Sequence, residues 1–397
     1  MNDIKWQENK MPKTADKNLS IMSIEEVKKA KAFHESFPQY SNTPLAELKE
    51  MSKYLGLGAI KVKDESYRFG LNAFKVLGGS YSMAKYIAQK MGKDVSELPY
   101  DILVSKKLKD EFGQATFFSA TDGNHGRGVA WAANKLGQKC VIFMPKGTTE
   151  IRLNNILKEG ATATIEKYNY DECVRMAADA ASKVKNGVVI QDTAWEGYEE
   201  IPAWIMQGYG TMALESDEQF GEKPTHIFVQ AGVGSLAGAI VGYFSNKYKD
   251  NPPKMIVVEA SAAACLYKGA VAGDGNIRIV DGDLNTIMAG LACGEPNITS
   301  WDILKNHVDC FISAEDIIAA RGMRMLSAPL KGDAQVISGE SGAVPFGALA
   351  TIMLNDEYSE LRKKLDLNSN SKVLLFSTEG DTDPQRWKNI IWEAKNK

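Results

Sequence analysis

Several common sequence features are missing from this chain, and each absence excludes a class of protein. Its five cysteines are odd in number and show no CxxC spacing, which argues against a disulfide framework and against a zinc site. Cysteines used in this way are typical of a reducing compartment, so we predict a cytoplasmic protein without a metal ion. The sequence leaves open whether Cys265 and Cys293 pair with each other.

No stretch of the chain combines the length and the apolarity of a membrane segment. The apolar run at residues 236–244 is far too short to span a bilayer. The first ten residues are polar and lack the apolar core of a signal peptide. We therefore predict that the protein has no membrane partner.

The charge of the chain is nearly balanced. It has 47 Lys and Arg residues, 50 Asp and Glu residues and a formal net charge of -3. This balance gives no broad polyphosphate-binding surface, so we predict no nucleic-acid partner. With 44% hydrophobic and 24% charged residues the composition is that of a soluble globular protein, and 397 residues suggest two or three domains.

Strand-like and helix-like segments alternate through the middle of the chain. This alternation predicts parallel βαβ units and an α/β fold. We expect a small α/β domain at residues 86–212 and a large discontinuous domain made of residues 1–85 and 213–397. Three segments outside the alternation are predicted as a loosely held arm at residues 1–20, a turn at 42–45 before a helix at 46–55, and a surface insertion at 92–113.

The stretch around Lys75 is the first candidate for chemistry. An alternating pattern at residues 59–65 predicts a strand, and helical spacing at residues 80–89 predicts a helix, so Lys75 lies in the loop that enters this helix. The exposed N–H groups and the dipole of a helix N-terminus disfavour an ammonium ion. A lysine held there loses its proton more easily, as a Schiff-base nucleophile must.

A glycine-rich turn follows the predicted strand at residues 225–230. Its sequence, Gly232-Val-Gly-Ser-Leu-Ala-Gly238, lets backbone N–H groups and a helix dipole meet a phosphate, although a close-packed turn without a ligand has a similar composition. Two functional interpretations stay open. Ser235 supplies a hydroxyl that suits a terminal monophosphate, whereas Glu259 falls where the ribose-binding acid of a nicotinamide-dependent dehydrogenase would lie.

Polar side chains follow two further predicted strands. The segment Ser119-Ala-Thr-Asp-Gly-Asn-His-Gly126 leads from a strand into a helix and carries Asp122, Asn124 and His125. Such residues face the ligand cleft of an open α/β sheet, although Asp122 or Asn124 can equally cap the helix. We expect Asp192, which follows another strand of the same domain, at the same edge, with an Asx turn as the alternative.

Taken together, four segments resemble a known family. They are Asn72-Ala-Phe-Lys-Val-Leu-Gly-Gly-Ser-Tyr81, Ala120-Thr-Asp-Gly-Asn-His-Gly-Arg-Gly128, Gln191-Asp-Thr-Ala-Trp-Glu-Gly197 and Ser377-Thr-Glu-Gly-Asp-Thr-Asp383. With the glycine-rich turn they resemble the fold-type II pyridoxal-phosphate enzymes, and within these the diaminopropionate ammonia-lyases. The resemblance extends from about residue 21 to the C-terminus. Its most specific mark is Asp122, where the related threonine dehydratases carry a small residue.

The resemblance implies a fold, a cofactor and a set of contacts. The fold would be two open, twisted, mostly parallel sheets with flanking helices, and the cofactor would be pyridoxal 5′-phosphate. Lys75 would bind the cofactor covalently, and Asn124 would bond its ring hydroxyl. Ser377, with Thr378 beside it, would meet the pyridine nitrogen, although Asp381 leaves a carboxylate partner open. The phosphate would be held by Gly232, Val233, Gly234, Ser235 and Leu236.

The resemblance also implies a reaction, the α,β-elimination of 2,3-diaminopropionate to pyruvate and two ammonia. Lys75 and Asp122 would act as bases on opposite faces of the substrate, so that both the L and the D isomer react. Asp122 and Asp192 would face the two amino groups of this small amino acid. A homodimer is implied as well. The alternatives are a serine/threonine dehydratase of the same fold and an NAD(P)-dependent dehydrogenase.

Overall fold

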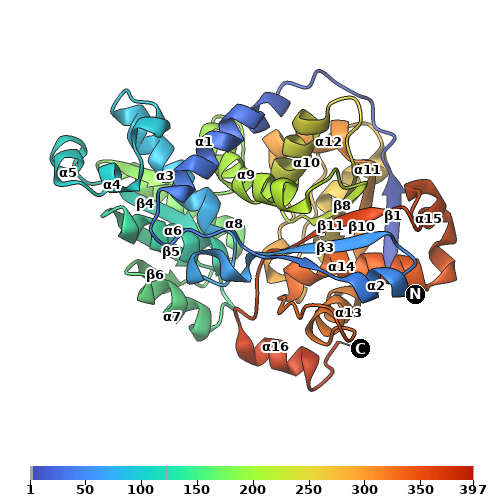
Figure 1. Cartoon of the computed structure of the whole chain (residues 1–397). Coiled ribbons are helices and arrows are strands. Elements are labelled where there is room, and N and C mark those ends of the chain that lie inside the picture. The colour runs from blue at the N-terminus through green and yellow to red at the C-terminus, as the bar shows by residue number, and fades with distance from the viewer. Residues whose placement is uncertain (1–2, 122, 397) are drawn as a thin grey trace. The chain divides into compact units, whose positions relative to one another are not determined.

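The computed structural model describes residues 3–121 and 123–396 and divides the chain into two compact units, and most of their elements are labelled in Figure 1. Unit 1 comprises residues 1–24, 42–67 and 212–397, and unit 2 comprises residues 25–41 and 68–211. The sequence prediction placed residues 25–41 and 68–85 in the large domain, whereas this division places them with the middle of the chain. Aromatic packing inside unit 2 accounts for this, because the rings of Phe37 and Phe69 have centroids 5.8 Å and 5.0 Å from that of Trp131 in the middle of the chain.

A seven-stranded sheet forms the framework of unit 1. Its order is β1-β10-β9-β8-β11-β3-β2, with parallel central strands and antiparallel pairing of β1 and β2 at the two edges. The strands are β1 (Ile4–Glu8), β2 (Leu45–Glu47), β3 (Ala59–Asp64), β8 (His226–Gln230), β9 (Lys254–Ala260), β10 (Cys310–Ala314) and β11 (Lys372–Ser377).

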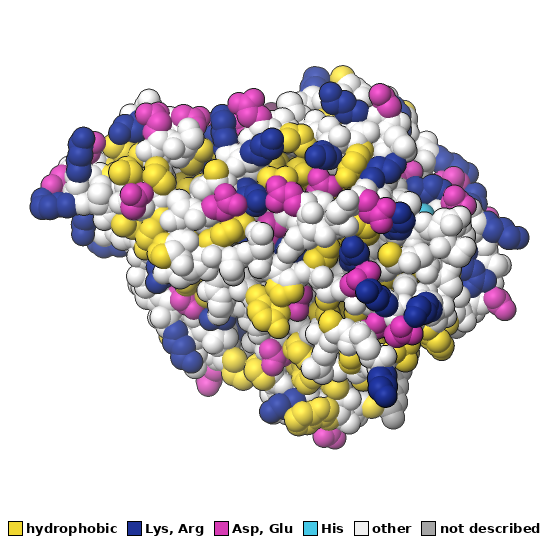
Figure 2. All heavy atoms as spheres, viewed as in Figure 1, with side chains coloured by type: hydrophobic (Ala, Val, Ile, Leu, Met, Phe, Trp, Pro, Cys, Tyr) yellow, Lys and Arg dark blue, Asp and Glu magenta, His cyan; other side chains and the backbone are white. Residues whose placement is uncertain are grey.

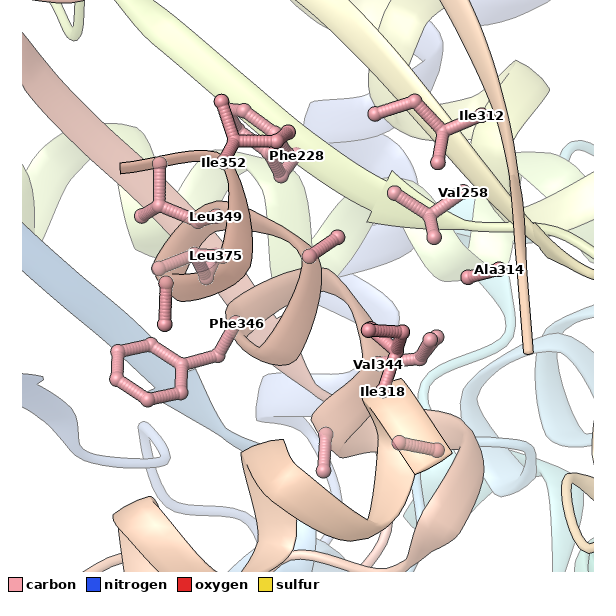
Figure 3. Close-up of a cluster of buried hydrophobic side chains, with 14 of the residues drawn as sticks. Phe228, Val258, Ile312, Ala314, Ile318, Val344, Phe346, Leu349, Ile352 and Leu375 are labelled. Carbon is pink, nitrogen blue, oxygen red and sulfur yellow. The ribbon is translucent and has the colours of Figure 1, made fainter. Parts of the chain in front are cut away.

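Helix α14 (Glu340–Leu354) covers part of this sheet and supplies much of the core. Figure 3 shows Leu349 and Ile352 of this helix beside Phe228 of β8 and Leu375 of β11, and all four side chains are buried. Each such side chain contributes about 1.5–3 kcal/mol when it is removed from water. The other α-helices of unit 1 are α2 (Lys49–Tyr54), α10 (Ser235–Tyr248), α11 (Cys265–Ala272), α12 (Ile298–His307), α13 (Asp316–Ser327), α15 (Ser359–Leu365) and α16 (Pro384–Ile391).

Unit 2 contains a four-stranded sheet of order β6-β5-β4-β7, and all of its pairings are parallel. The predicted parallel βαβ units and the expected two mostly parallel sheets are therefore confirmed. The strands are β4 (Thr116–Ala120), β5 (Lys139–Met144), β6 (Thr162–Ile165) and β7 (Gly187–Val189). The helices are α1 (Ile24–Glu35), α3 (Val76–Lys90), α4 (Tyr100–Leu103), α5 (Lys106–Phe112), α6 (Asn124–Lys135), α7 (Glu150–Lys158) and α8 (Tyr170–Ser182), while α9 (Glu200–Phe220) continues from unit 2 into unit 1.

The predicted loose arm at residues 1–20 is wrong where the chain forms β1. Ile4 is buried, and its backbone N–H donates to the Tyr358 hydroxyl at 3.2 Å. Antiparallel pairing with β10 begins with Ile4 opposite Ala314. The local sequence could not reveal this strand, because the partner that orders it lies near the other end of the chain.

The predicted helix at residues 46–55 is also wrong in its first part. Residues Leu45–Glu47 form β2, and α2 begins only at Lys49. The carboxylate of Asp333 accepts the backbone N–H groups of Glu50 and Met51, each at 2.8 Å, and so caps this helix. A cap that comes from a distant residue leaves no signal in the local sequence. The segment at residues 92–113, predicted as a surface insertion, contains α4 and α5.

The remaining expectations concern the surface and the cysteines. Basic and acidic side chains are interspersed over the face shown in Figure 2, in keeping with the balanced composition. Among the helices that the structure describes, none has both the length and the apolarity to cross a membrane. Cys265 and Cys293 do not form a disulfide with each other, which answers the open question about this pair.

Candidate active site

Lys75 lies immediately before α3, at the end of a strained turn in unit 2. In this turn Phe69 and Asn72 have left-handed backbone conformations, with φ of 49° and 60°. Asparagine tolerates this conformation, whereas phenylalanine adopts it only where packing holds it there. The Phe69 ring has its centroid 5.0 Å from that of Trp131 and 5.7 Å from that of Phe37. Aromatic packing therefore fixes the turn that presents Lys75.

The first residues of α3 also lie against α6. A Cβ on Gly128 would lie 2.7 Å from the backbone nitrogen of Val76 and 3.0 Å from the carbonyl carbon of Lys75, so the two backbones meet here because Gly128 has no side chain. Asn124 lies one turn before Gly128 on the same helical face and lines a crevice that also includes Ala73. The structure thus brings Asn124 to the segment that carries Lys75.

Asp192 is the acidic partner of Lys75 within unit 2. The Lys75 ammonium donates to Oδ2 of Asp192 in an ion pair, and their side chains are 20% and 6% exposed. Burial raises the pKa of this carboxyl, but the charges of Lys75 and His125 outweigh it, and the pKa falls to about 2. Asp192 is therefore ionised at neutral pH.

Gln191 begins one of the four family-like segments but was not a predicted site residue, and it anchors the backbone just before Asp192. Its side-chain Oε1 accepts the backbone N–H of Ala120 at 3.1 Å and the hydroxyl of Ser119 at 3.0 Å. Its own backbone N–H donates to the Tyr198 hydroxyl at 2.9 Å. Gln191 thus ties the end of β4 to the residue that pairs with Lys75. A single glutamine after a strand gives no distinctive sequence signal for this role.

Two further side chains lie close to the ion pair. Nε2 of His125 lies 2.9 Å from the carbonyl oxygen of Ile190, and its Nδ1 lies 3.9 Å from Oδ2 of Asp192. The Lys75 ammonium lies 5.9 Å from the centroid of the Tyr209 ring, and burial raises the pKa of Tyr209, so its hydroxyl stays neutral. His125 was part of a predicted motif. Tyr209 was not predicted as a site residue, because it lies in a helix with an apolar face, where a tyrosine is expected to be a core residue. The predicted site residue Asp122 lies outside the described residues.

In unit 1 the glycine-rich turn joins β8 to α10, as the sequence predicts. Gly234 has φ of 103°, a backbone conformation that glycine adopts without strain. The first N–H groups of α10, which include those of Ser235 and Leu236, have no acceptor within their own helix. Free N–H groups of this kind and the dipole of a helix are suited to an anion such as a phosphate. Gly232 and Val233 complete the turn, and Gly232 is the more exposed of the two.

Ser377 and Thr378 lie at the same edge of the unit 1 sheet as this turn. Ser377 ends β11, which runs parallel and next to β8, so both strands end on one side. The Ser377 hydroxyl donates to Oγ of Ser338 at 2.8 Å, and Oγ1 of Thr378 accepts from the side chain of Gln230 at 2.7 Å. Gln230 is the last residue of β8 and a further residue that the sequence analysis missed.

Glu259 does not have the geometry of a ribose-binding acid. Its side chain is fully buried, and its two carboxyl oxygens accept the backbone N–H groups of Leu266 at 2.9 Å and Tyr267 at 2.6 Å. These contacts hold the N-terminal end of α11. Burial raises the pKa of Glu259 to about 8, although both hydrogen bonds oppose this. Glu259 is a structural residue. It therefore does not serve as the ribose-binding acid on which the dehydrogenase interpretation depended.

The raised pKa of Glu259 predicts a specific dependence of stability on pH. Because the folded pKa lies above the ordinary value of 4.5, this group stabilises the fold fully below pH 4.5 and loses that contribution as the pH rises toward 8. The loss is on the order of 5 kcal/mol, since each pKa unit is worth about 1.4 kcal/mol. Urea unfolding of the parent and of Glu259→Gln should therefore show the variant gaining relative stability between about pH 5 and pH 8. A difference that stays constant with pH would contradict this assignment.

Comparisons with known proteins identify the family. The profile of the family described as "Pyridoxal-phosphate dependent enzyme" matches residues 37–379. Diaminopropionate ammonia-lyase of Salmonella typhimurium is 50% identical over 92% of this chain and 91% of its own length. The Escherichia coli enzyme of the same name is 46% identical over 95% of this chain and 94% of its own length. This chain belongs to the diaminopropionate ammonia-lyase family.

Solved structures of the family support the same conclusion. The Escherichia coli diaminopropionate ammonia-lyase in complex with an aminoacrylate-PLP azomethine reaction intermediate matches 99% of this chain and 98% of its own, with 43% identity and a TM-score of 0.89. The fold is thus the fold-type II pyridoxal-phosphate fold that the resemblance implied. The comparisons favour neither the dehydratase nor the dehydrogenase alternative.

Proposed function

We propose that this protein is a pyridoxal-phosphate-dependent ammonia-lyase that converts L- and D-2,3-diaminopropionate and water to pyruvate and two ammonia. The observation that carries the proposal is the pair of Lys75 and the ionised Asp192 at the loop that enters α3. This pair lies in a chain that is 50% identical to a diaminopropionate ammonia-lyase over 92% of its length.

Each predicted site residue would meet one part of the cofactor. The turn from Gly232 to Leu236 offers backbone N–H groups to the phosphate, and the left-handed Gly234 leaves room beside them because a side chain is absent. Lys75 would bind the cofactor covalently, and Asn124 would donate to the ring hydroxyl. Ser377 would meet the pyridine nitrogen with a hydroxyl next to Thr378. When bound, pyridoxal phosphate supplies an electron sink for the negative charge that develops at the substrate α-carbon.

The chain's own residues would bind the substrate and move its protons. The Lys75 amine would take the α-proton of the L isomer. Asp192, ionised and held in place by Gln191, attracts an ammonium group of a substrate that carries two of them. Asp122 would act as the base for the D isomer from the opposite face.

We also propose that the protein works as a homodimer in the cytoplasm. The five cysteines form no disulfide, which agrees with a reducing compartment. The dimer is inferred from the family resemblance, and the expected substrate partner is a small amino acid.

A coupled assay tests the proposed function. Purified protein loaded with pyridoxal phosphate is incubated with L- or D-diaminopropionate, and pyruvate and ammonia are measured in parallel. We expect a yellow protein that is bleached by borohydride with label at Lys75, and two ammonia for each pyruvate. One ammonia per pyruvate from serine, or one ammonia per 2-oxobutyrate from threonine, without turnover of diaminopropionate, would identify a dehydratase. Binding of NAD by a colourless protein would identify a dehydrogenase instead.

A further inference from the structure

Asn297 is a buried residue outside the predicted site that contacts the glycine-rich turn at two points. It lies immediately before α12 and is fully buried. Its backbone N–H donates to the carbonyl oxygen of Val233 at 2.7 Å, and its side-chain Nδ2 donates to Oγ of Ser235 at 2.8 Å. One residue from another segment of unit 1 therefore holds the turn on both sides of Gly234.

A third hydrogen bond fixes the orientation of the Asn297 amide. Its Oδ1 accepts the backbone N–H of Ser300 at 3.0 Å and so caps α12. Because the oxygen faces the helix, the NH₂ group faces Ser235, and the Ser235 hydroxyl accepts in this contact. The hydroxyl proton of Ser235 is therefore directed away from Asn297.

Helix α12 also packs directly on the turn. A Cβ on Gly234 would lie 3.3 Å from Cδ1 of Leu304 and 3.5 Å from Cβ of Ser300, both of which belong to α12. The cap, the backbone contact and this packing together make α12 and Asn297 a rigid support for the turn. A binding site needs such support if its hydrogen-bond donors are to keep the orientation required for binding when no ligand is present.

We propose that Asn297 is a positioning residue for the cofactor phosphate. It holds the carbonyl of Val233 and turns the Ser235 hydroxyl so that its proton can be donated to a phosphate oxygen. It does not touch the cofactor itself and acts through Ser235 and the backbone of the turn. This inference rests on the proposed function, because it assumes that the turn binds the phosphate of pyridoxal phosphate.

Asn297→Asp gives the sharpest test. The variant keeps the oxygen that caps α12, but it replaces the donor that faces Ser235 with a second carboxylate oxygen. The Ser235 hydroxyl would then donate its proton to this new carboxylate, and a negative charge would lie near the phosphate site. We expect the apoprotein to bind pyridoxal phosphate about 10- to 100-fold more weakly, as measured by titration of its absorbance.

Asn169→Asp provides a matched control. Asn169 caps α8 in unit 2 and accepts the backbone N–H of Glu172 at 2.9 Å, so the same chemical change is made at another helix N-terminus. Its affinity for pyridoxal phosphate should equal that of the parent. Asn297→Ser serves as a second variant, because serine can still cap α12 but is too short to reach Ser235. We expect it to weaken binding about 3- to 10-fold.

Pyridoxal, which lacks the phosphate, distinguishes positioning from general loosening. Asn297→Asp should leave the binding of pyridoxal unchanged while it weakens the binding of pyridoxal phosphate. Combined with Ser235→Ala, it should cost less than the product of the two separate losses, because both changes act on one hydroxyl. Unchanged affinity for pyridoxal phosphate, or equal losses for both ligands, would overturn the inference. If the unmutated apoprotein bound no pyridoxal phosphate, the proposed function would fail, and this inference with it.

Discussion

The Lys75→Ala variant is expected to lose turnover of diaminopropionate and the yellow colour of the holoprotein. The alanine side chain can neither bind the cofactor covalently nor take the α-proton, so the rate should fall by more than about 10³-fold. Absorbance of the purified variant and pyruvate formation measure the two losses. A variant that keeps both its colour and its full activity would remove the central claim about this site.

Lys75→Arg separates the chemistry of Lys75 from its charge. Arginine keeps a positive group beside Asp192 but stays protonated and cannot bind the cofactor covalently. In the apoprotein, Lys75→Ala leaves the buried Asp192 without this cation, which costs about 3 kcal/mol or more of stability, whereas Lys75→Arg should cost less. We therefore expect equal losses of turnover and unequal losses of stability in urea unfolding. If Lys75→Ala and Lys75→Arg lost the same amount of stability, the ion pair would contribute little to the stability of the fold.

Asp122→Asn should reduce turnover of D-diaminopropionate more than that of the L isomer. The substitution preserves the shape of the side chain but removes a base, and the loss of one proton-transfer group typically costs on the order of 10²–10⁴-fold in rate. The L isomer, whose α-proton goes to Lys75, should keep more of its turnover. Steady-state rates on both isomers, for the variant and the parent, measure the difference.

The matched control for this change is Asp179→Asn on α8. Asp179 is exposed and pairs with Lys183 one turn away, so its replacement should alter neither rate. If Asp122→Asn slowed both isomers equally, Asp122 would bind the substrate or assist the leaving group, and the scheme with two bases would be abandoned.

Features that depend on neighbours in the sequence could be predicted. The position of Lys75 before a helix and the turn from Gly232 to Leu236 follow from local periodicity and from glycine spacing, and the structure confirms both. Asp192 was expected at a strand end, and the structure adds that Lys75 is its partner.

Features that depend on distant partners could not be predicted. Gln191 contacts β4, and Asn297 contacts Ser235, which lies 62 residues earlier in the chain. A ribose-binding role for Glu259 was an open alternative because its place at a strand end matched a known pattern, whereas its burial and its two backbone donors became visible only in three dimensions. The same limit explains why the strand at Ile4 was missed.

The strand β1 has a practical consequence for producing this protein. It pairs along the full length of β10, whose five residues are all buried. Removing residues 1–8 would leave the backbone N–H and C=O groups of an apolar strand open to pairing with other chains, which is a common route to aggregation. An expression plasmid that removes these residues should give inclusion bodies, so an affinity tag should be placed before them rather than replace them.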